Sequence, residues 1–160
     1  MRVKQLKIFS LACLVVYFLA GCSGADDMRF ARRVMSLLVK GVYSAADMID
    51  WPSFKALERG IGPEFQRLPN DAEKANYQKA FIEGFRLAFQ DKGCRMSNFK
   101  NWQLYREAGA DDISIVSTST VDKSFALLFF IKHEKGRRKL TEIKMVRVFD
   151  EKLFYSKRQG

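Results

Sequence analysis

Histidine, cysteine and proline are scarce in this chain. Its 160 residues include one histidine, three cysteines and three prolines. A structural zinc site is built from closely spaced cysteine and histidine ligands, and the sequence has no such cluster. It also lacks a nucleotide-binding glycine loop, a Gly-x-Ser-x-Gly motif and a His-Glu-x-x-His motif. We therefore expect a non-enzymatic protein, with no catalytic residue, no cofactor and no bound metal.

Two polar features remain that resemble catalytic groups. Asp111-Asp112 is a carboxylate pair, but it lies beside Gly109, and aspartate is a common turn residue. His133 stands next to Glu134 beside a predicted hairpin turn, where side chains usually face solvent. A catalytic triad would need a nucleophile that only the fold could bring to His133.

The beginning of the chain has the pattern of an export signal. Arg2, Lys4 and Lys7 precede an uncharged stretch over residues 8–20. A bilayer-spanning helix needs about 20 apolar residues, so this run is short for a permanent span. A basic start, a short apolar core and small residues at its end are the parts of a secretory signal peptide.

The signal ends in Leu19-Ala20-Gly21-Cys22, which resembles the lipobox of bacterial lipoproteins. The resemblance implies that a signal peptidase recognises Leu19, Ala20 and Gly21, that residues 1–21 are removed, and that Cys22 is acylated. In the sorting pattern of many Gram-negative lipoproteins, aspartate after the cysteine retains the protein at the inner membrane, so the resemblance with Ser23 at this position implies the periplasmic face of the outer membrane. The alternative is a plain signal peptide, or an uncleaved anchor, in which Cys22 has no special role. We expect residues 22–27 to form the acylated N-terminus and a short tether.

The remainder, residues 28–160, is expected to be a single domain. Removing residues 1–21 takes away three cations, so the formal charge falls from +10 to +7. Anionic lipid head groups or acidic glycans are the expected contacts in the envelope and nucleic acid is not, although the charge could also serve solubility alone. Cys94 is the only other cysteine after residue 22, so stability must come from packing and not from an internal disulfide.

The hydrophobic pattern predicts helices followed by strands. Helices are expected at about 26–46, where Asp26 or Asp27 supplies the cap, at 50–59, and at 71–92, where Asn70 and Glu73 are close to a capping box. Strands are expected at about 99–106, 113–121, 125–131 and 140–149. The predicted fold is α+β, with N-terminal helices packed on a curved four-stranded antiparallel sheet.

Two sets of residues are candidate binding sites. The first is a set of aromatic residues on elements expected to face inward, which would line an apolar cavity or simply fill the core: Phe81, Phe85, Trp102, Phe125 and Phe129. The second is a basic cluster around Gly136, which would contact an anionic surface or form a solvated loop that discourages edge pairing: Lys135, Arg137, Arg138 and Lys139.

The order of helices and strands resembles the NTF2-like and cystatin-like superfamily. The stretch 57–148 is also similar to periplasmic phospholipid-shuttling proteins of the toluene-tolerance type, in which an aromatic-rich helix, here with Tyr77, Phe81 and Phe85, precedes a sheet that holds acyl chains. Two functions are therefore expected. The first is a membrane-anchored envelope lipoprotein that binds a partner protein, and the alternative is a carrier of a lipid or small apolar ligand.

Overall fold

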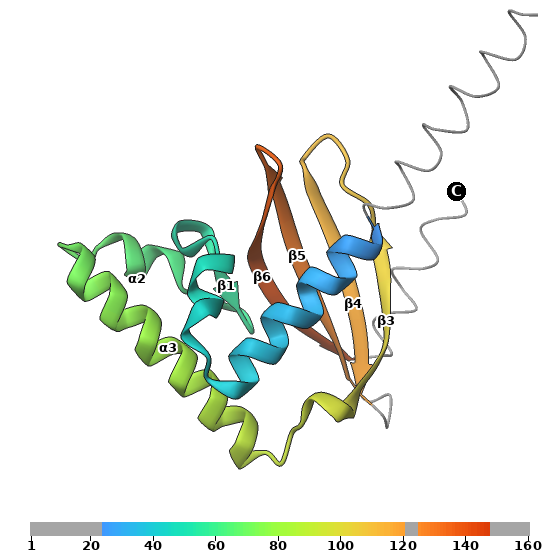
Figure 1. Ribbon diagram of the computed structural model, residues 1–160, viewed down its shortest axis with the longest axis horizontal. Coiled ribbons are helices and arrows are strands. Elements are labelled where there is room, and N and C mark those ends of the chain that lie inside the picture. The colour runs from blue at the N-terminus through green and yellow to red at the C-terminus, as the bar shows by residue number, and fades with distance from the viewer. Residues whose placement is uncertain (1–23, 121–124, 148–160) are drawn as a thin grey trace, which may run out of the picture.

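The computed structural model describes residues 24–120 and 125–147 of the chain. Within these residues the fold is α+β, as predicted, with helices gathered on one side of an open sheet (Figure 1). The four residues of the lipobox-like segment lie outside the described residues.

The sheet has six strands in the order β2-β1-β6-β5-β4-β3. Its four long strands are antiparallel neighbours, as expected: β3 (Phe99–Arg106), β4 (Ile113–Thr120), β5 (Phe125–Glu134) and β6 (Arg137–Arg147). Two short strands, β1 (Lys55–Ala56) and β2 (Arg59–Gly60), extend the sheet, and β1 runs parallel to β6. The sheet is therefore mixed and larger than the four-stranded antiparallel sheet expected from the sequence.

The expected helix at 50–59 is wrong, because Asp50 and residues 55–57 pair with the edge of β6. It contains only one 3₁₀ turn, η2 (Trp51–Ser53), before the β1–β2 hairpin. The backbone N–H of Asp50 donates to the carbonyl of Leu140 at 2.9 Å, and that of Leu57 donates to Ile143 at 2.8 Å. Pairing with β6 thus satisfies backbone groups that a helix would have satisfied locally.

The helix of residues 24–40, called helix 24–40 below, covers the inner face of the sheet (Figure 1). Ala31, Val34, Met35 and Leu38 on this helix are fully buried in the same core as sheet residues that are also fully buried, namely Val116, Phe129, Ile131, Leu140 and Ile143. Burial of such side chains stabilises the fold by about 1.5–3 kcal/mol each. This layer is the main core of the protein.

Both ends of helix 24–40 differ from the expected boundaries. Residues 24–27, expected as part of a tether, are already helical, and Asp27 is buried. The helix ends at residue 40 because Gly41 adopts a left-handed conformation with φ of 70°. A 3₁₀ segment, η1 (Tyr43–Met48), follows in place of the expected helical continuation to residue 46.

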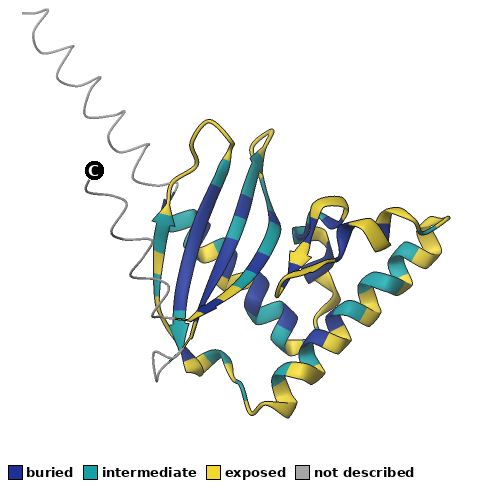
Figure 2. Cartoon of the chain, turned by 180° about the vertical axis from the view of Figure 1, so that it is seen from behind, coloured by how far each residue is buried: buried dark blue, intermediate teal, exposed yellow. Residues whose placement is uncertain are grey.

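Helix α3 (Asp71–Asp91) forms close to its expected bounds, and the Asn70 side chain accepts a hydrogen bond from the Glu73 N–H at 2.9 Å. We expected α3 to cover the sheet together with helix 24–40. Instead it lies beyond helix 24–40, against η1 and near the short helix α2 (Gly62–Gln66) (Figure 1). Only Ile82 and Phe85 of α3 are buried, and much of its surface is exposed (Figure 2). A last 3₁₀ turn, η3 (Met96–Asn98), leads into β3.

Candidate binding groove

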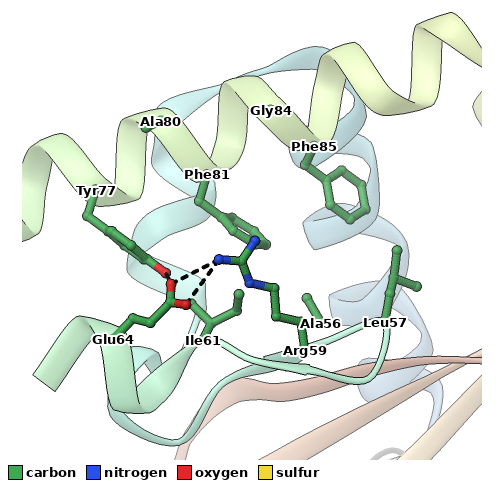
Figure 3. Close-up of a pocket in the computed structure, with 10 residues that line it drawn as sticks. All are labelled: Ala56, Leu57, Arg59, Ile61, Glu64, Tyr77, Ala80, Phe81, Gly84 and Phe85. Atoms are coloured by element: carbon green, nitrogen blue, oxygen red, sulfur yellow. Dashed lines mark hydrogen bonds and ion pairs between the residues drawn. The ribbon is translucent and has the colours of Figure 1, made fainter.

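A groove runs between α3 and the segment from β1 to α2, with a volume of about 490 Å³ (Figure 3). We call it the α3 groove. Its lining is mostly apolar along α3 and becomes polar at the end nearest α2. The lining residues come from both walls: Tyr77, Ala80, Phe81, Gly84 and Phe85 from α3, and Ala56, Leu57, Arg59, Ile61 and Glu64 from the opposite wall.

The α3 wall is kept open by small residues that lie one helical turn apart. A Cβ atom added at Gly84 would meet no other atom within 4 Å, so the groove has free space at this point. Between the small residues, the ring of Phe81 packs edge-on against Trp51 and Phe54, each at a centroid distance of 5.5 Å. The aromatic cluster therefore forms a firm apolar floor beneath an open helix face.

The opposite wall depends on the tight turn between β1 and β2. The turn residues Leu57 and Glu58 have φ angles of 50° and 71°, the left-handed values of a type I′ hairpin turn. A bulky residue such as leucine is uncommon there, and each such residue costs about 1–3 kcal/mol. The turn places Leu57, 45% exposed, at the side of the groove. An exposed apolar side chain held at a conformational cost favours a binding role over a packing role.

The polar end is a network of three side chains. Arg59 Nη2 donates to both carboxylate oxygens of Glu64, at 3.0 and 3.2 Å, and the Tyr77 hydroxyl donates to Glu64 Oε2 at 2.8 Å. The hydrogen bond from Tyr77, followed by that from Arg59, lowers the pKa of Glu64. Burial, followed by the hydrogen bond to Glu64, raises the pKa of Tyr77 to about 12. Near neutral pH the network therefore holds an ionised carboxylate, a charged guanidinium and a neutral phenol.

The five aromatic residues expected to line one cavity do not share one. Phe81 and Phe85 line the α3 groove, whereas Trp102 and Phe129 stack on each other at 5.4 Å within the main core. Phe125 lies at the beginning of β5 and is 39% exposed. The separation follows from helix 24–40, which fills the space over the sheet that the sequence assigned to α3.

Sequence reasoning missed the residues that give the groove its second wall and its polar end, Leu57, Arg59 and Glu64. They face α3 only because β1 pairs with β6, so no local pattern marks them. The helical spacing of Tyr77 with Phe81 was the one available signal, since it already put an aromatic face on this helix.

The four cations expected at an anionic surface have different environments. Arg138 is largely engaged, because its Nε donates to Asp27 Oδ1 at 2.6 Å and its Nη2 lies 3.6 Å from Asp26 Oδ2. Lys139 donates to the backbone carbonyl of Asp47. Lys135 and Arg137 flank Gly136 and are exposed. Within the basic cluster, Arg138 and Lys139 therefore make structural contacts, whereas Lys135 and Arg137 are accessible to solvent.

His133 lies beside a serine and an aspartate, but the geometry is not that of a catalytic triad. Its Nε2 atom is 3.2 Å from Asp27 Oδ2 and 3.1 Å from Ser114 Oγ. A triad needs the acid and the nucleophile on opposite ring nitrogens, whereas here both approach the same one. Ser114 is also fully buried, so a substrate could not reach it. The cluster joins helix 24–40 to β4 and β5.

The acidic pair has a structural role on the Asp111 side. Asp111 accepts hydrogen bonds from the Ile113 N–H at 3.3 Å and from Arg106 Nη2 at 2.7 Å. The backbone bond to Ile113 and the bond from Arg106 hold the pKa of Asp111 below its usual value. Asp112 adopts a left-handed φ of 52° in the same turn. This geometry fits the turn interpretation of the pair.

The chain matches no known protein family, no curated protein sequence and no solved structure. Among the helices in residues 24–120 and 125–147, none is long and apolar enough to cross a membrane. The functional interpretation of the α3 groove therefore depends on the geometry of the groove alone.

Proposed function

We propose that this chain is a lipid-anchored protein of the bacterial cell envelope that binds a partner protein and catalyses no reaction. Cys22 carries the lipid, and the domain faces the periplasm from the outer membrane. The partner inserts an apolar segment into the α3 groove. One observation carries the proposal: an open apolar groove with a network of fixed charges at one end.

The lining of the groove supports binding and not proton transfer. Ligand sites are usually apolar concavities with a few polar groups that fix orientation, and the α3 groove has this composition. A general acid or base works best when its pKa is near the working pH. The pKa shifts of Glu64 and Tyr77 move both groups away from neutrality, so the network suits recognition.

The position of the groove relative to Cys22 supports a partner in the aqueous compartment. Gly24 is two positions after Cys22, and an extended chain of this length spans at most about 7 Å. Helix 24–40 then extends for about 25 Å at 1.5 Å per residue. Its far end adjoins α3, since a Cβ on Gly41 would lie 2.5 Å from Arg86 Cδ. The groove thus stands at the end of the helix that is remote from the lipid.

The alternative is a carrier of a lipid or small apolar ligand. Its support is the aromatic character of Phe81 and Phe85, the groove volume of about 490 Å³, and the resemblance to NTF2-like and phospholipid-shuttling proteins. The space between helix 24–40 and the sheet is filled by fully buried side chains such as Val34 and Phe129. A carried ligand would therefore occupy the α3 groove.

The test places a photo-crosslinking amino acid at Leu57 in the full-length chain, expressed in cells. We expect one envelope protein to be crosslinked through an apolar segment identified by peptide mass spectrometry. Gly84→Leu fills the groove and should abolish this adduct. Ala88→Leu, one turn further along α3 and outside the groove, is the matched control and should retain it.

Other outcomes distinguish the two functions. An adduct that persists in Gly84→Leu contradicts docking in the groove. A lipid that co-purifies with the protein in native mass spectrometry, and is lost in Gly84→Leu but kept in Ala88→Leu, supports the carrier instead. The anchor is tested separately, because an N-terminal peptide with unmodified Cys22 contradicts lipidation.

A further inference from the structure

A second concave surface lies where helix 24–40, η1 and β6 meet. It has a volume of about 530 Å³ and is lined by Phe30, Asp47, Arg137, Arg138 and Lys139. We call it the basic basin. Three of its five lining residues are cations and one is an acid. Because Arg138 is also paired with Asp27 and Asp26, the positive charge available to a ligand comes from Arg137 and Lys139.

Two of these cations are held in place by the surrounding structure. The guanidinium of Arg138 is fixed by the buried carboxylate of Asp27, with Nε to Oδ1 at 2.6 Å. The Lys139 ammonium is fixed by the Asp47 backbone carbonyl, which accepts a hydrogen bond without neutralising the charge. Arg137 is exposed at the rim. A binding group arriving here meets cations that need little reorganisation.

The basin lies close to the expected attachment point of the lipid. Asp27 is three residues after Gly24, about 4.5 Å along a helix, and it contacts Arg138 directly. If Cys22 is acylated, Gly24 follows it by two positions, which keeps this end of the domain within about 7 Å of the anchor. The head groups of the bilayer are then within reach of the basin.

We propose that the basic basin binds the phosphate of an anionic phospholipid in the membrane that holds the lipid anchor. This inference rests on the lipid anchoring proposed above. Arginine presents a fork of N–H donors that matches phosphate oxygens, and Arg137 supplies this group at the rim. The half-buried ring of Phe30 supplies an apolar wall beside the cations, next to the acyl boundary. The bound phosphate orients the domain so that the α3 groove faces away from the membrane.

The experiment uses residues 22–160 with Cys22→Ser, which retains every described residue and removes the lipid. Binding is measured by co-flotation with vesicles of phosphatidylcholine alone or with added phosphatidylglycerol. We expect binding only when phosphatidylglycerol is present, decreasing as salt is raised. A single cation near an anionic surface contributes about a fivefold change in binding, which is the loss expected for Arg137→Gln.

Arg147→Gln is the matched control. Arg137 and Arg147 are the first and last residues of β6 and both are exposed, so the two changes remove the same charge about 33 Å apart. Arg147→Gln should bind phosphatidylglycerol vesicles as the unchanged protein does. Thermal unfolding of both variants verifies that the fold is intact.

Three results would overturn the inference. Equal loss of binding in both variants would show a general effect of net charge. Binding of soluble glycerol phosphate that is lost in Arg137→Gln, without vesicle binding, would identify a site for a free anion. No dependence on phosphatidylglycerol would remove the basin as a lipid contact. None of these results tests the proposed lipid anchor. The mass of the N-terminal peptide tests it independently.

Discussion

Helix 24–40 and α3 are both long helices, yet they use their apolar residues differently. Four residues of helix 24–40 are fully buried against the sheet, whereas α3 buries only Ile82 and Phe85 along its 21 residues. The first helix closes a core and the second leaves the wall of a groove open. The comparison indicates that, in the described chain, the main core and the open groove belong to separate layers.

The largest expected effect comes from comparing a core aromatic with a groove aromatic. Phe129→Ala removes a fully buried ring stacked on Trp102, and should lower the free energy of unfolding by about 3–5 kcal/mol. Phe81→Ala should cost clearly less, because its ring is half-buried. Urea denaturation of both variants measures the difference. Equal losses would contradict the separation of a core layer from a groove layer.

The next effect concerns the contact between helix 24–40 and the β5–β6 hairpin. Asp27→Ala leaves Arg138 and His133 without their buried partner and should lower the free energy of unfolding by about 1–3 kcal/mol. Asp26→Ala removes only partly exposed ion pairs and should change it by less than about 1 kcal/mol. Chemical denaturation measures the free energy of unfolding of both variants. A larger loss of this free energy for Asp26→Ala would contradict Asp27 as the main partner of Arg138 and His133.

A smaller pair of changes compares glycines at the two helices. Gly41→Ala forces a left-handed residue with φ of 70° against the Arg86 side chain, and should destabilise the fold by about 1 kcal/mol. Gly84→Ala lies inside α3 with free space around it, and should stabilise the fold by about 0.5–1 kcal/mol. Melting temperatures should therefore move in opposite directions. A fall in both would mean that the groove is filled at Gly84.

The smallest effect is a titration at the polar end of the groove. Tyr77 has its pKa raised to about 12, so the neutral phenol is the form that the fold favours. Its contribution to stability is therefore present below the ordinary tyrosine pKa of about 10 and is lost as pH rises toward 12. The difference in ultraviolet titration between the unchanged protein and Tyr77→Phe isolates this group. Glu64→Gln should lower the Tyr77 pKa, and an unchanged titration would contradict the network.

Local sequence signals were sufficient for the elements that local chemistry determines. Asn70 with Glu73 marked the beginning of α3, and β-branched and aromatic runs marked the long strands. The β1–β2 hairpin was missed because Asp50-Trp51-Pro52 has the composition of a helix start, while the pairing that decides its structure joins Ala56 to Ile143. No local pattern reports a partner so distant in the chain.

The candidate sites also combine residues that local sequence patterns reveal with residues that only the fold brings together. The aromatic face of α3 was visible in the helical spacing of Phe81 and Phe85, and the cations of β6 were visible as a cluster. The opposite wall of the groove and the Asp27 contact of Arg138 were not, since each depends on residues far apart in sequence. Sequence reasoning thus found half of each surface, and the fold supplies the other half.

The parallel pairing of β1 with β6 has a mechanical consequence. Lys139 lines the basic basin, and Ile143, four residues further along β6, holds β1 and with it the hairpin wall of the α3 groove. The two surfaces are therefore attached to one strand about 13 Å apart. Both surfaces therefore share one strand as their frame, so tilting the domain against a surface at the basin also turns the mouth of the groove.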